Sequence, residues 1–221
     1  MNTFFYIRYE TNDDIWMTLI SSGNYSGTPD PHLVFINVIW GKLISFFYDH
    51  FPQFEWYTLF MLGMLNIAAS FIAVSILKVS SNKYIKVSFL FLLIVFFIRI
   101  VVLMQFTTTA ALVSLSGIIL ILTYKSYLKY FGIILALVGA LIRFEAVILV
   151  LLITTPLFLI PFIKNHKISF SFKLFLVTIV GILCCEFYDK HYYNKNMEWN
   201  YYRDYNQLRG QINDNPNAIS I

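Results

Sequence analysis

Charged side chains are scarce in this sequence, since Asp, Glu, Lys and Arg together make up 13% of its 221 residues. A soluble domain carries about twice that share of charge and fewer apolar residues than the 58% found here. The composition therefore argues against a soluble enzyme. The formal net charge of +4 does not indicate nucleic-acid binding either, because the basic residues lie between apolar runs and form no continuous basic patch.

Cysteine is also rare. The two cysteines, Cys184 and Cys185, are adjacent within an apolar run. Neighbouring cysteines in such a run supply neither a disulfide framework nor the ligand spacing of a zinc site. We therefore expect both to be packing residues.

Long apolar runs dominate the rest of the chain. A transmembrane helix needs about 20 apolar residues, or fewer where neighbouring helices shelter it. Runs of this kind predict spans at residues 57–78, 87–104, 109–124, 130–143, 144–163 and 174–188. The third and fourth are short, so either could be tilted, partly embedded or re-entrant. The predicted fold class is therefore all-α, a polytopic transmembrane protein with about six spans within residues 57–188.

The placement of charge predicts the orientation. Lysines cluster in three connections between spans: Lys78, Lys83 and Lys86; Lys125 and Lys129; and Lys164, Lys167 and Lys173. Acidic residues lie before the first span, or at the end of the last span and after it, except for Glu145 at the turn between the fourth and fifth spans. If successive spans cross the membrane in opposite directions, all of these lysines lie on one side and the acidic residues on the other. By the positive-inside rule, the lysine side is cytoplasmic. The pattern predicts a multi-pass protein of the plasma membrane.

Both ends of the chain are then predicted to lie on the non-cytoplasmic side. Residues 1–56 form an acidic loop with an interfacial helix at 33–50, because that run is too short to span and Lys42 interrupts it. Residues 189–221 form a polar tail. Neither a span nor a signal peptide precedes the acidic loop, and the tail closes no element, so we expect the chain to be part of a longer protein.

Two groups of polar residues in the acidic loop could carry chemistry. Asp13 and Asp14 are adjacent, and Asp30 and His32 follow in a stretch rich in Gly and Pro. Like charges close together raise one pKa, so one of the paired carboxylates could act as a general base. Carboxylates and an imidazole could equally hold a divalent cation. The alternative is an exposed acidic loop in which Asp13 caps a helix over residues 15–23.

Two arginines lie within the predicted spans. Arg99 is in the second span, and Arg143 is at the outer end of the fourth, two residues before Glu145. Arginine in apolar surroundings usually faces a cavity or a partner, and its planar guanidinium suits a phosphate group. The alternative is that each side chain extends to the lipid headgroups. Residues two apart on a helix face different directions, so we do not expect Arg143 and Glu145 to pair.

The polar tail is rich in Tyr, Asn and Arg. Its aromatic residues suit an interfacial belt and equally suit stacking on sugars: Trp199, Tyr201, Tyr202 and Tyr205. Arg203 and Arg209 could approach lipid phosphates, because guanidinium groups bind phosphate through charge-assisted hydrogen bonds.

An acidic pair in the first outer loop, an interfacial helix after it and many short spans resemble the C-type (GT-C) membrane glycosyltransferases. Five stretches look more closely like a family of bacterial GT-C-like membrane proteins: NDDIWMTLISSGNYSGTPDPHLVFIN, WYTLF, QFTTTAA, ALIRFEA and YNQLRGQINDNPN. The resemblance extends over most of the chain. This chain departs from the family in having no helix before the aspartates and in ending early.

The resemblance implies a transferase that moves a sugar from a polyprenyl-phosphate donor to a glycan or lipid acceptor of the cell envelope. In such enzymes a first-loop aspartate activates the acceptor hydroxyl, so Asp13 or Asp14 would be the base. Arg143, Arg203 or Arg209 would hold the phosphate. Asp30 and His32 would be secondary substrate-binding residues.

A second hypothesis is a non-enzymatic membrane protein, namely a transporter, flippase or scaffold in envelope glycan assembly. A transporter is expected to show paired repeats and polar groups near the middle of the membrane. The sequence has no internal repeat, and its polar residues gather at the outer face. These features disfavour transport and leave a scaffold open.

Overall fold

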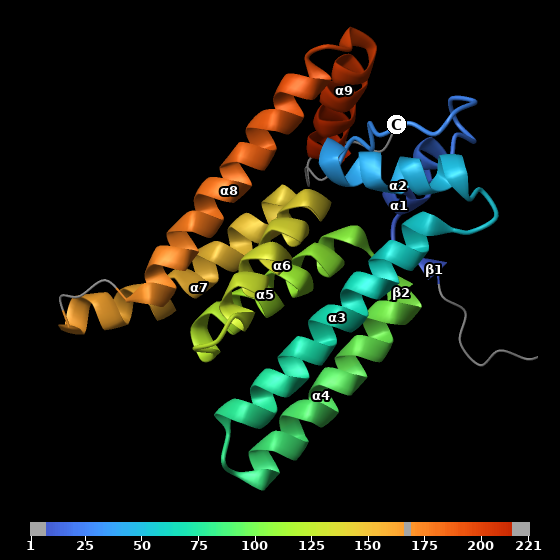
Figure 1. Cartoon of the computed structure of the whole chain (residues 1–221). Coiled ribbons are helices and arrows are strands. Elements are labelled where there is room, and N and C mark those ends of the chain that lie inside the picture. The colour runs from blue at the N-terminus through green and yellow to red at the C-terminus, as the bar shows by residue number, and fades with distance from the viewer. Residues whose placement is uncertain (1–7, 166–168, 214–221) are drawn as a thin grey trace, which may run out of the picture.

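The chain is almost entirely helical in its computed structural model, which describes residues 8–165 and 169–213 (Figure 1). The helices are α1 (Asn12–Ser21), α2 (Val38–His50), α3 (Trp56–Val79), α4 (Lys83–Val102), α5 (Phe106–Thr123), α6 (Leu128–Ile142), α7 (Phe144–Asn165), α8 (Phe170–Tyr193) and α9 (Met197–Asn213). Two short strands, β1 (Arg8–Tyr9) and β2 (Leu103–Met104), pair in parallel and tie the start of the chain to the turn between α4 and α5. The predicted all-α class is confirmed.

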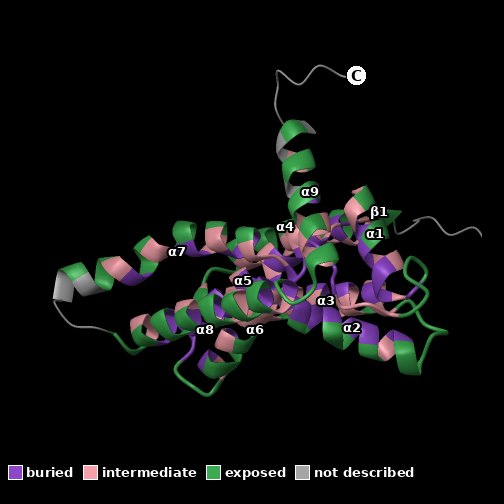
Figure 2. Ribbon diagram, turned by 90° about the horizontal axis from the view of Figure 1, so that it is seen from above, coloured by how far each residue is buried: buried purple, intermediate pink, exposed green. Residues whose placement is uncertain are grey.

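Within the described residues, five helices are long and apolar enough to cross a membrane: α3, α4, α5, residues 144–161 of α7, and α8. Their outward faces carry large apolar side chains, and Figure 2 shows exposed residues along α7 and α8. In α4 only Ile100 is buried. Water would penalise so much exposed hydrocarbon, whereas lipid does not. The chain is therefore a multi-pass membrane protein.

Each of the six predicted spans corresponds to one helix. The predicted span 109–124 corresponds to α5, which has 18 residues. The predicted span 130–143 corresponds to α6, which has 15 residues and is too short to count among the five candidate spans. The α4 helix ends at Val102 because the chain then extends to form β2.

The two shorter apolar helices, α5 and α6, pack backbone against backbone. A Cβ atom on Gly117 would meet the carbonyl oxygen of Gly132, and a Cβ on Gly132 would meet that of Gly117. Further along, a Cβ on Gly139 would lie 2.8 Å from the carbonyl oxygen of Ala110. Small residues allow this approach, which supplies dispersion contacts where no hydrophobic driving force exists in lipid. The α5–α6 pair thereby forms the tightly packed centre of the bundle.

The helices α1, α2 and α9, which are not among the five candidate spans, gather at one end of the bundle, which we call the polar end (Figure 1). The interfacial helix predicted at 33–50 begins only at Val38, because Asn37 caps it by accepting from the backbone N–H of Ile39. Asn37 also donates its backbone N–H to Leu141 and its side-chain amide to Cys185, at 2.9 and 3.0 Å. One residue thus holds the start of α2 against α6 and α8.

Residues 33–37, which precede α2, are not helical but form a tight strap. The backbone N–H of Phe35 donates to Leu33 across a three-residue turn at 2.7 Å, and Val34 at its centre has a φ of 63°. A β-branched residue rarely adopts a positive φ, and such strain is found where the surrounding structure enforces it. Here the hydroxyl of Tyr193 in α8 accepts a hydrogen bond from the backbone N–H of Val34 at 2.9 Å, which holds the strained residue in place.

One other local prediction needs correction. Asp13 does not cap the first helix, because α1 starts at Asn12 with Thr11 before it, so Asp13 lies within the first turn. The polar tail predicted from residue 189 is helical over most of its described length. Asp189 belongs to α8, and residues 197–213 form α9.

Some parts of the predicted charge pattern lie outside the described residues. They are Lys167 in the connection between α7 and α8, Asp214, and the rest of the tail to residue 221.

We predict that Gly132→Val destabilises the α5–α6 pair by about 1–3 kcal/mol, the usual cost of overpacking. The added side chain would also press on Leu120 and Ile121, which lie 3.1 and 3.0 Å from the position of its Cβ. Thermal unfolding in detergent micelles measures the effect. Gly63→Val in α3 is the matched control, because nothing lies within 4 Å of that Cβ position. Equal melting temperatures for the two variants would contradict the packing described here.

Candidate functional site

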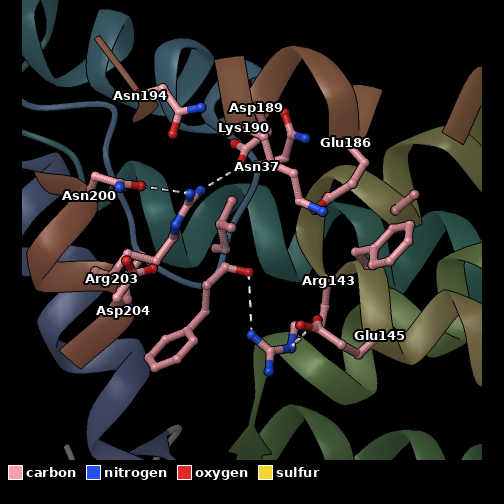
Figure 3. A pocket seen from close by; sticks show the side chains of 15 residues that line it. Asn37, Arg143, Glu145, Glu186, Asp189, Lys190, Asn194, Asn200, Arg203 and Asp204 are labelled. Atoms are coloured by element: carbon pink, nitrogen blue, oxygen red, sulfur yellow. Dashed lines mark hydrogen bonds and ion pairs between the residues drawn. The ribbon is translucent and has the colours of Figure 1, made fainter. Parts of the chain in front are cut away.

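A polar cavity of about 360 Å³ lies at the polar end of the bundle (Figure 3). Four segments form its walls: the strap at residues 34–37, the junction of α6 and α7, the last turns of α8, and the start of α9 with the turn before it. Three cations and four carboxylates line it, namely Arg143, Lys190 and Arg203, and Glu145, Glu186, Asp189 and Asp204. We refer to this space as the polar cavity.

Arg143 reaches the polar cavity from the junction of α6 and α7. Its guanidinium lies 5.1 Å from the ring centre of Phe35 and 5.3 Å from that of Phe106, so aromatic rings hold its position. It donates to the backbone carbonyl of Phe35 at 3.5 Å and pairs with Glu145 at 3.0 Å. The prediction that Arg143 and Glu145 do not pair was wrong, because Arg143 has extended backbone between two helices and is not on a helix with Glu145.

Arg203 reaches the polar cavity from α9 and is held from three sides. It donates to Asp189 at 3.1 Å and to the side-chain carbonyl of Asn200 at 3.0 Å, and it lies 4.0 Å above the ring of Tyr193. Asp189 in turn accepts the backbone N–H of Val38 at 2.6 Å. The carboxylate of Asp189 therefore joins α8 to both α2 and α9.

Every cation of the polar cavity has a carboxylate partner. Arg143 pairs with Glu145, Arg203 with Asp189, and Lys190 with Glu186 at 3.5 Å. With four carboxylates against three cations, the lining has no excess of positive charge. An anionic group in this cavity would have to share guanidinium hydrogen bonds with the resident carboxylates, whereas a neutral polyol could use both signs.

Asp14 is fully buried and accepts hydrogen bonds from three elements. Its donors are the Tyr57 hydroxyl at 2.7 Å, the Thr11 hydroxyl at 3.1 Å and the backbone N–H of Phe106 at 3.2 Å. Phe106 is the first residue of α5, so the carboxylate also caps the start of that helix. Burial raises the pKa of Asp14 to about 6, although these hydrogen bonds act in the opposite direction. The carboxylate joins α1 to α3 and α5.

Asp13 points the other way and is partly open, with 36% of its side chain exposed. It lies 4.0 Å from Arg209 of α9, and both residues line a small hollow between α1 and α9. Val34 and Phe35 line this hollow and the polar cavity alike. The strap therefore separates Asp13 and Arg209 on one side from Arg143 and Arg203 on the other.

Asp30 and His32 form a separate pair. Both the ring Nδ1 and the backbone N–H of His32 contact the Asp30 carboxylate, at 2.6 and 2.8 Å. Burial would raise the pKa of Asp30, but the hydrogen bonds from His32 outweigh it and hold the pKa below its usual range. The imidazole stacks on Trp199 and meets Tyr193 edge-on, while its buried Nε2 has no partner among the described residues. This pair packs α9 onto the acidic loop.

The structure thus brings the seven predicted site residues to one end but not into one cavity. Arg143 and Arg203 share the polar cavity, and Asp13 and Arg209 share the small hollow. Asp30 and His32 form their own pair, and Asp14 is in the core. Arg99 pairs with Glu10 at 3.8 Å outside the polar cavity. Within residues 8–165 and 169–213, no group of three His, Cys, Asp or Glu side chains could hold a metal ion.

Sequence reasoning missed the residues that fix the cavity walls. From the sequence, Asp189 was recognised only as one of the acidic residues on the non-cytoplasmic side. A carboxylate at the end of an apolar span is nevertheless a signal for a buried partner. Asn37 and Asn200 gave no signal, because asparagines in loops usually serve only turns and caps.

We predict that Asp14→Asn removes a pH dependence of stability. The pKa of about 6 in the folded chain lies above the usual value for an unfolded aspartate, so folding binds a proton between about pH 4 and pH 6. Stability from this group therefore falls as pH rises through that window. The asparagine variant should gain about 2 kcal/mol relative to the wild type between pH 4.5 and pH 7.5.

The test is thermal unfolding at pH 4.5 and pH 7.5, with Asp49→Asn on the exposed side of α2 as the matched control. A difference between wild type and Asp14→Asn that stays constant with pH would contradict the buried carboxylate.

The chain matches no protein-family model, and neither a curated protein nor a solved structure shows significant similarity to it.

Proposed function

We propose that the chain is a membrane glycosyltransferase, or part of one, that transfers a sugar from a polyprenyl-phosphate donor to an acceptor of the cell envelope. One observation carries the proposal: a charged cavity and a partly open carboxylate lie side by side at one end of a bundle of lipid-facing helices. A lipid-linked substrate needs a polar site next to lipid-facing helices. Its hydrocarbon chain stays in the bilayer, whereas its phosphate and sugar have to lie outside the hydrocarbon. The GT-C resemblance of the sequence supports the same reaction.

Asp13 is the base in this proposal. Transfer to an acceptor hydroxyl breaks the bond between the anomeric carbon and the phosphate oxygen and forms a new carbon–oxygen bond, and the hydroxyl proton passes to a carboxylate. Asp13 has an accessible carboxylate for this step, whereas Asp14 is buried and already accepts from Tyr57, Thr11 and Phe106. Asp14 acts as a positioning residue that fixes the first turn of α1 and therefore the direction of Asp13.

The arginines bind the departing phosphate. Arg143 and Arg203 line the polar cavity, and Arg209 lies beside Asp13 across the strap. Each guanidinium has five N–H donors, so a resident carboxylate leaves donors for a phosphate oxygen. Their existing ion pairs with Glu145 and Asp189 preorganise the two cavity arginines, which reduces the reorganisation needed when charge develops on the phosphate.

The proposed compartment follows from charge. The polar end carries the acidic segments, while the opposite ends of the spans carry the lysine-rich connections. By the positive-inside rule the polar end faces away from the cytoplasm of a bacterial cell. An envelope acceptor would be present on that side.

A scaffold or transporter in the same pathway is the second candidate. A transporter would need a polar path through the bundle, whereas the polar cavity is at one end and the centre is closed by the glycine contacts of α5 and α6. This arrangement favours the enzyme over the transporter. Sugar uptake into vesicles that survives the loss of Asp13 would favour transport.

We predict that Asp13→Asn lowers the transfer rate by at least about 100-fold, the usual contribution of a general base, while Asp14→Asn retains most of it in folded protein. The measurement uses the protein in vesicles with radiolabelled polyprenyl-phosphate sugars. Asp49→Asn is the matched control, because that carboxylate lies outside the polar cavity and the small hollow. Unchanged transfer by Asp13→Asn would falsify the assignment of the base, and no transfer by the folded wild type with any donor would favour the scaffold.

We predict that Arg143→Lys raises the KM for the lipid-linked donor by about tenfold. Lysine keeps the charge and the pairing with Glu145 but loses the planar fork that fits phosphate. Donor titration at fixed acceptor concentration measures the change. Arg99→Lys is the control, because Arg99 pairs with Glu10 outside the polar cavity. An unchanged KM in Arg143→Lys would remove this residue from donor binding.

A further inference from the structure

The polar cavity has two sides that carry different polar groups (Figure 3). Arg143 and Glu145 lie at the junction of α6 and α7. Asn194 directly follows α8 and Asn200 is in the first turn of α9, and Figure 3 shows both on the other side of the cavity. We call the two sides the arginine end and the amide end. A ligand that fills the cavity therefore meets different chemistry at each end.

The ion pair at the arginine end is the more open of the two arginine pairs in the cavity. The side chain of Glu145 is 62% exposed, whereas those of Asp189 and Arg203 are 11% and 13% exposed. Asp189 also accepts from the backbone N–H of Val38, so it cannot turn away from Arg203 without leaving that donor unsatisfied. A phosphate can therefore take the place of Glu145 on Arg143 more readily than it can displace Asp189.

The amide end offers hydrogen-bonding groups that have no charge. Within the described residues, the side chain of Asn194 makes no hydrogen bond, and Asn200 uses only its side-chain carbonyl oxygen, which accepts from Arg203. A carboxamide donates and accepts hydrogen bonds, and so does a hydroxyl group. The free valences of these two asparagines therefore match the hydroxyl or acetamido groups of a sugar.

Asp204 adds negative charge to the amide end. It lies one turn after Asn200 on α9, so the two side chains are neighbours on the helix surface. The other three carboxylates of the cavity each have a cation within 4.0 Å, but no cation in the described part of the chain lies that close to Asp204. A sugar with a carboxylate would place a second negative charge here with no free cation to offset it.

A positively charged sugar is also disfavoured at this end. An ammonium group that approaches Asp189 or Glu186 also approaches Arg203 or Lys190, which already pair with those carboxylates. An uncharged sugar meets neither conflict, because its hydroxyl groups can donate to carboxylates and accept from the amides.

We infer that the amide end binds the sugar of the lipid-linked donor, that this sugar is uncharged, and that Asp204 excludes sugars that carry a carboxylate. The inference rests on the proposed transfer function, which supplies the donor. The phosphate then lies at the arginine end. Asp204 acts on the choice of substrate and takes no part in forming or breaking bonds.

The test measures donor binding without an acceptor. The protein in nanodiscs is mixed with polyprenyl phosphate linked to glucose, glucuronate or glucosamine, each in competition with labelled polyprenyl-phosphate glucose. The glucose donor should bind at least about fivefold more tightly than the glucuronate donor, the effect of one like charge about 4 Å away in water. Equal affinity for these two donors, tighter binding of the glucosamine donor, or no binding of any donor would overturn the inference.

Two variants test the residues of the amide end. Asp204→Asn keeps the shape but removes the charge, so the preference for glucose over glucuronate should fall to about twofold or less. Glu198→Gln is the matched control and should keep the full preference, because Glu198 is exposed on the same helix and does not line the cavity. Full preference in Asp204→Asn would remove this residue from sugar selection.

Asn194→Ala locates the sugar. This exposed side chain has no partner in the described residues, so its loss should leave the fold intact. The variant should bind the glucose donor about fivefold more weakly and should bind polyprenyl phosphate without a sugar as the wild type does. Equal weakening of both ligands, or of neither, would contradict a sugar at the amide end.

The binding results are separate from those of the transfer assay. Selective binding of the glucose donor by a folded protein that transfers no sugar would refute the transferase and leave the selectivity of the amide end. Transfer from glucose and glucuronate donors with equal efficiency would refute the selectivity and leave the transferase.

Discussion

The Asp14 carboxylate lies out of reach of solvent and accepts hydrogen bonds from α3, from the first residue of α5 and from the residue before α1. A carboxylate in the core is costly unless such donors surround it. Two of these donors lie 43 and 92 residues away in sequence, so they fix how α1 docks against α3 and α5. The docking of α1 fixes the direction of Asp13, and the polar end is built around that fixed helix.

The strap at residues 33–37 and the Asp189 carboxylate organise the other side of the polar end. Tyr193 holds the strained backbone at Val34, and Asp189 holds the start of α2 and the guanidinium of Arg203. Both anchors belong to α8. The end of one long helix therefore holds the backbone of the strap and the start of α2. Because of these contacts, the acidic loop needs no regular structure of its own there.

Apolar runs and lysine clusters were enough to predict the six long apolar helices, because the length of a span and its charged ends are local properties of the sequence. The roles of Asp13 and Asp14 could not be separated in this way. Adjacent residues on a helix point about 100° apart, and which one turns inward depends on Tyr57 and Phe106, which are distant in sequence. The pairing of Arg143 with Glu145 was missed for a related reason, since it depends on a single extended residue between two helices.

The α8 helix runs unbroken from Phe170 to Tyr193, from lipid-facing turns to the wall of the polar cavity. A helix of this length adjusts its tilt when the thickness of the bilayer changes. Asp189 and Tyr193 at its end bind the start of α2, the strap and Arg203, so three of the four walls of the polar cavity are attached to this one helix.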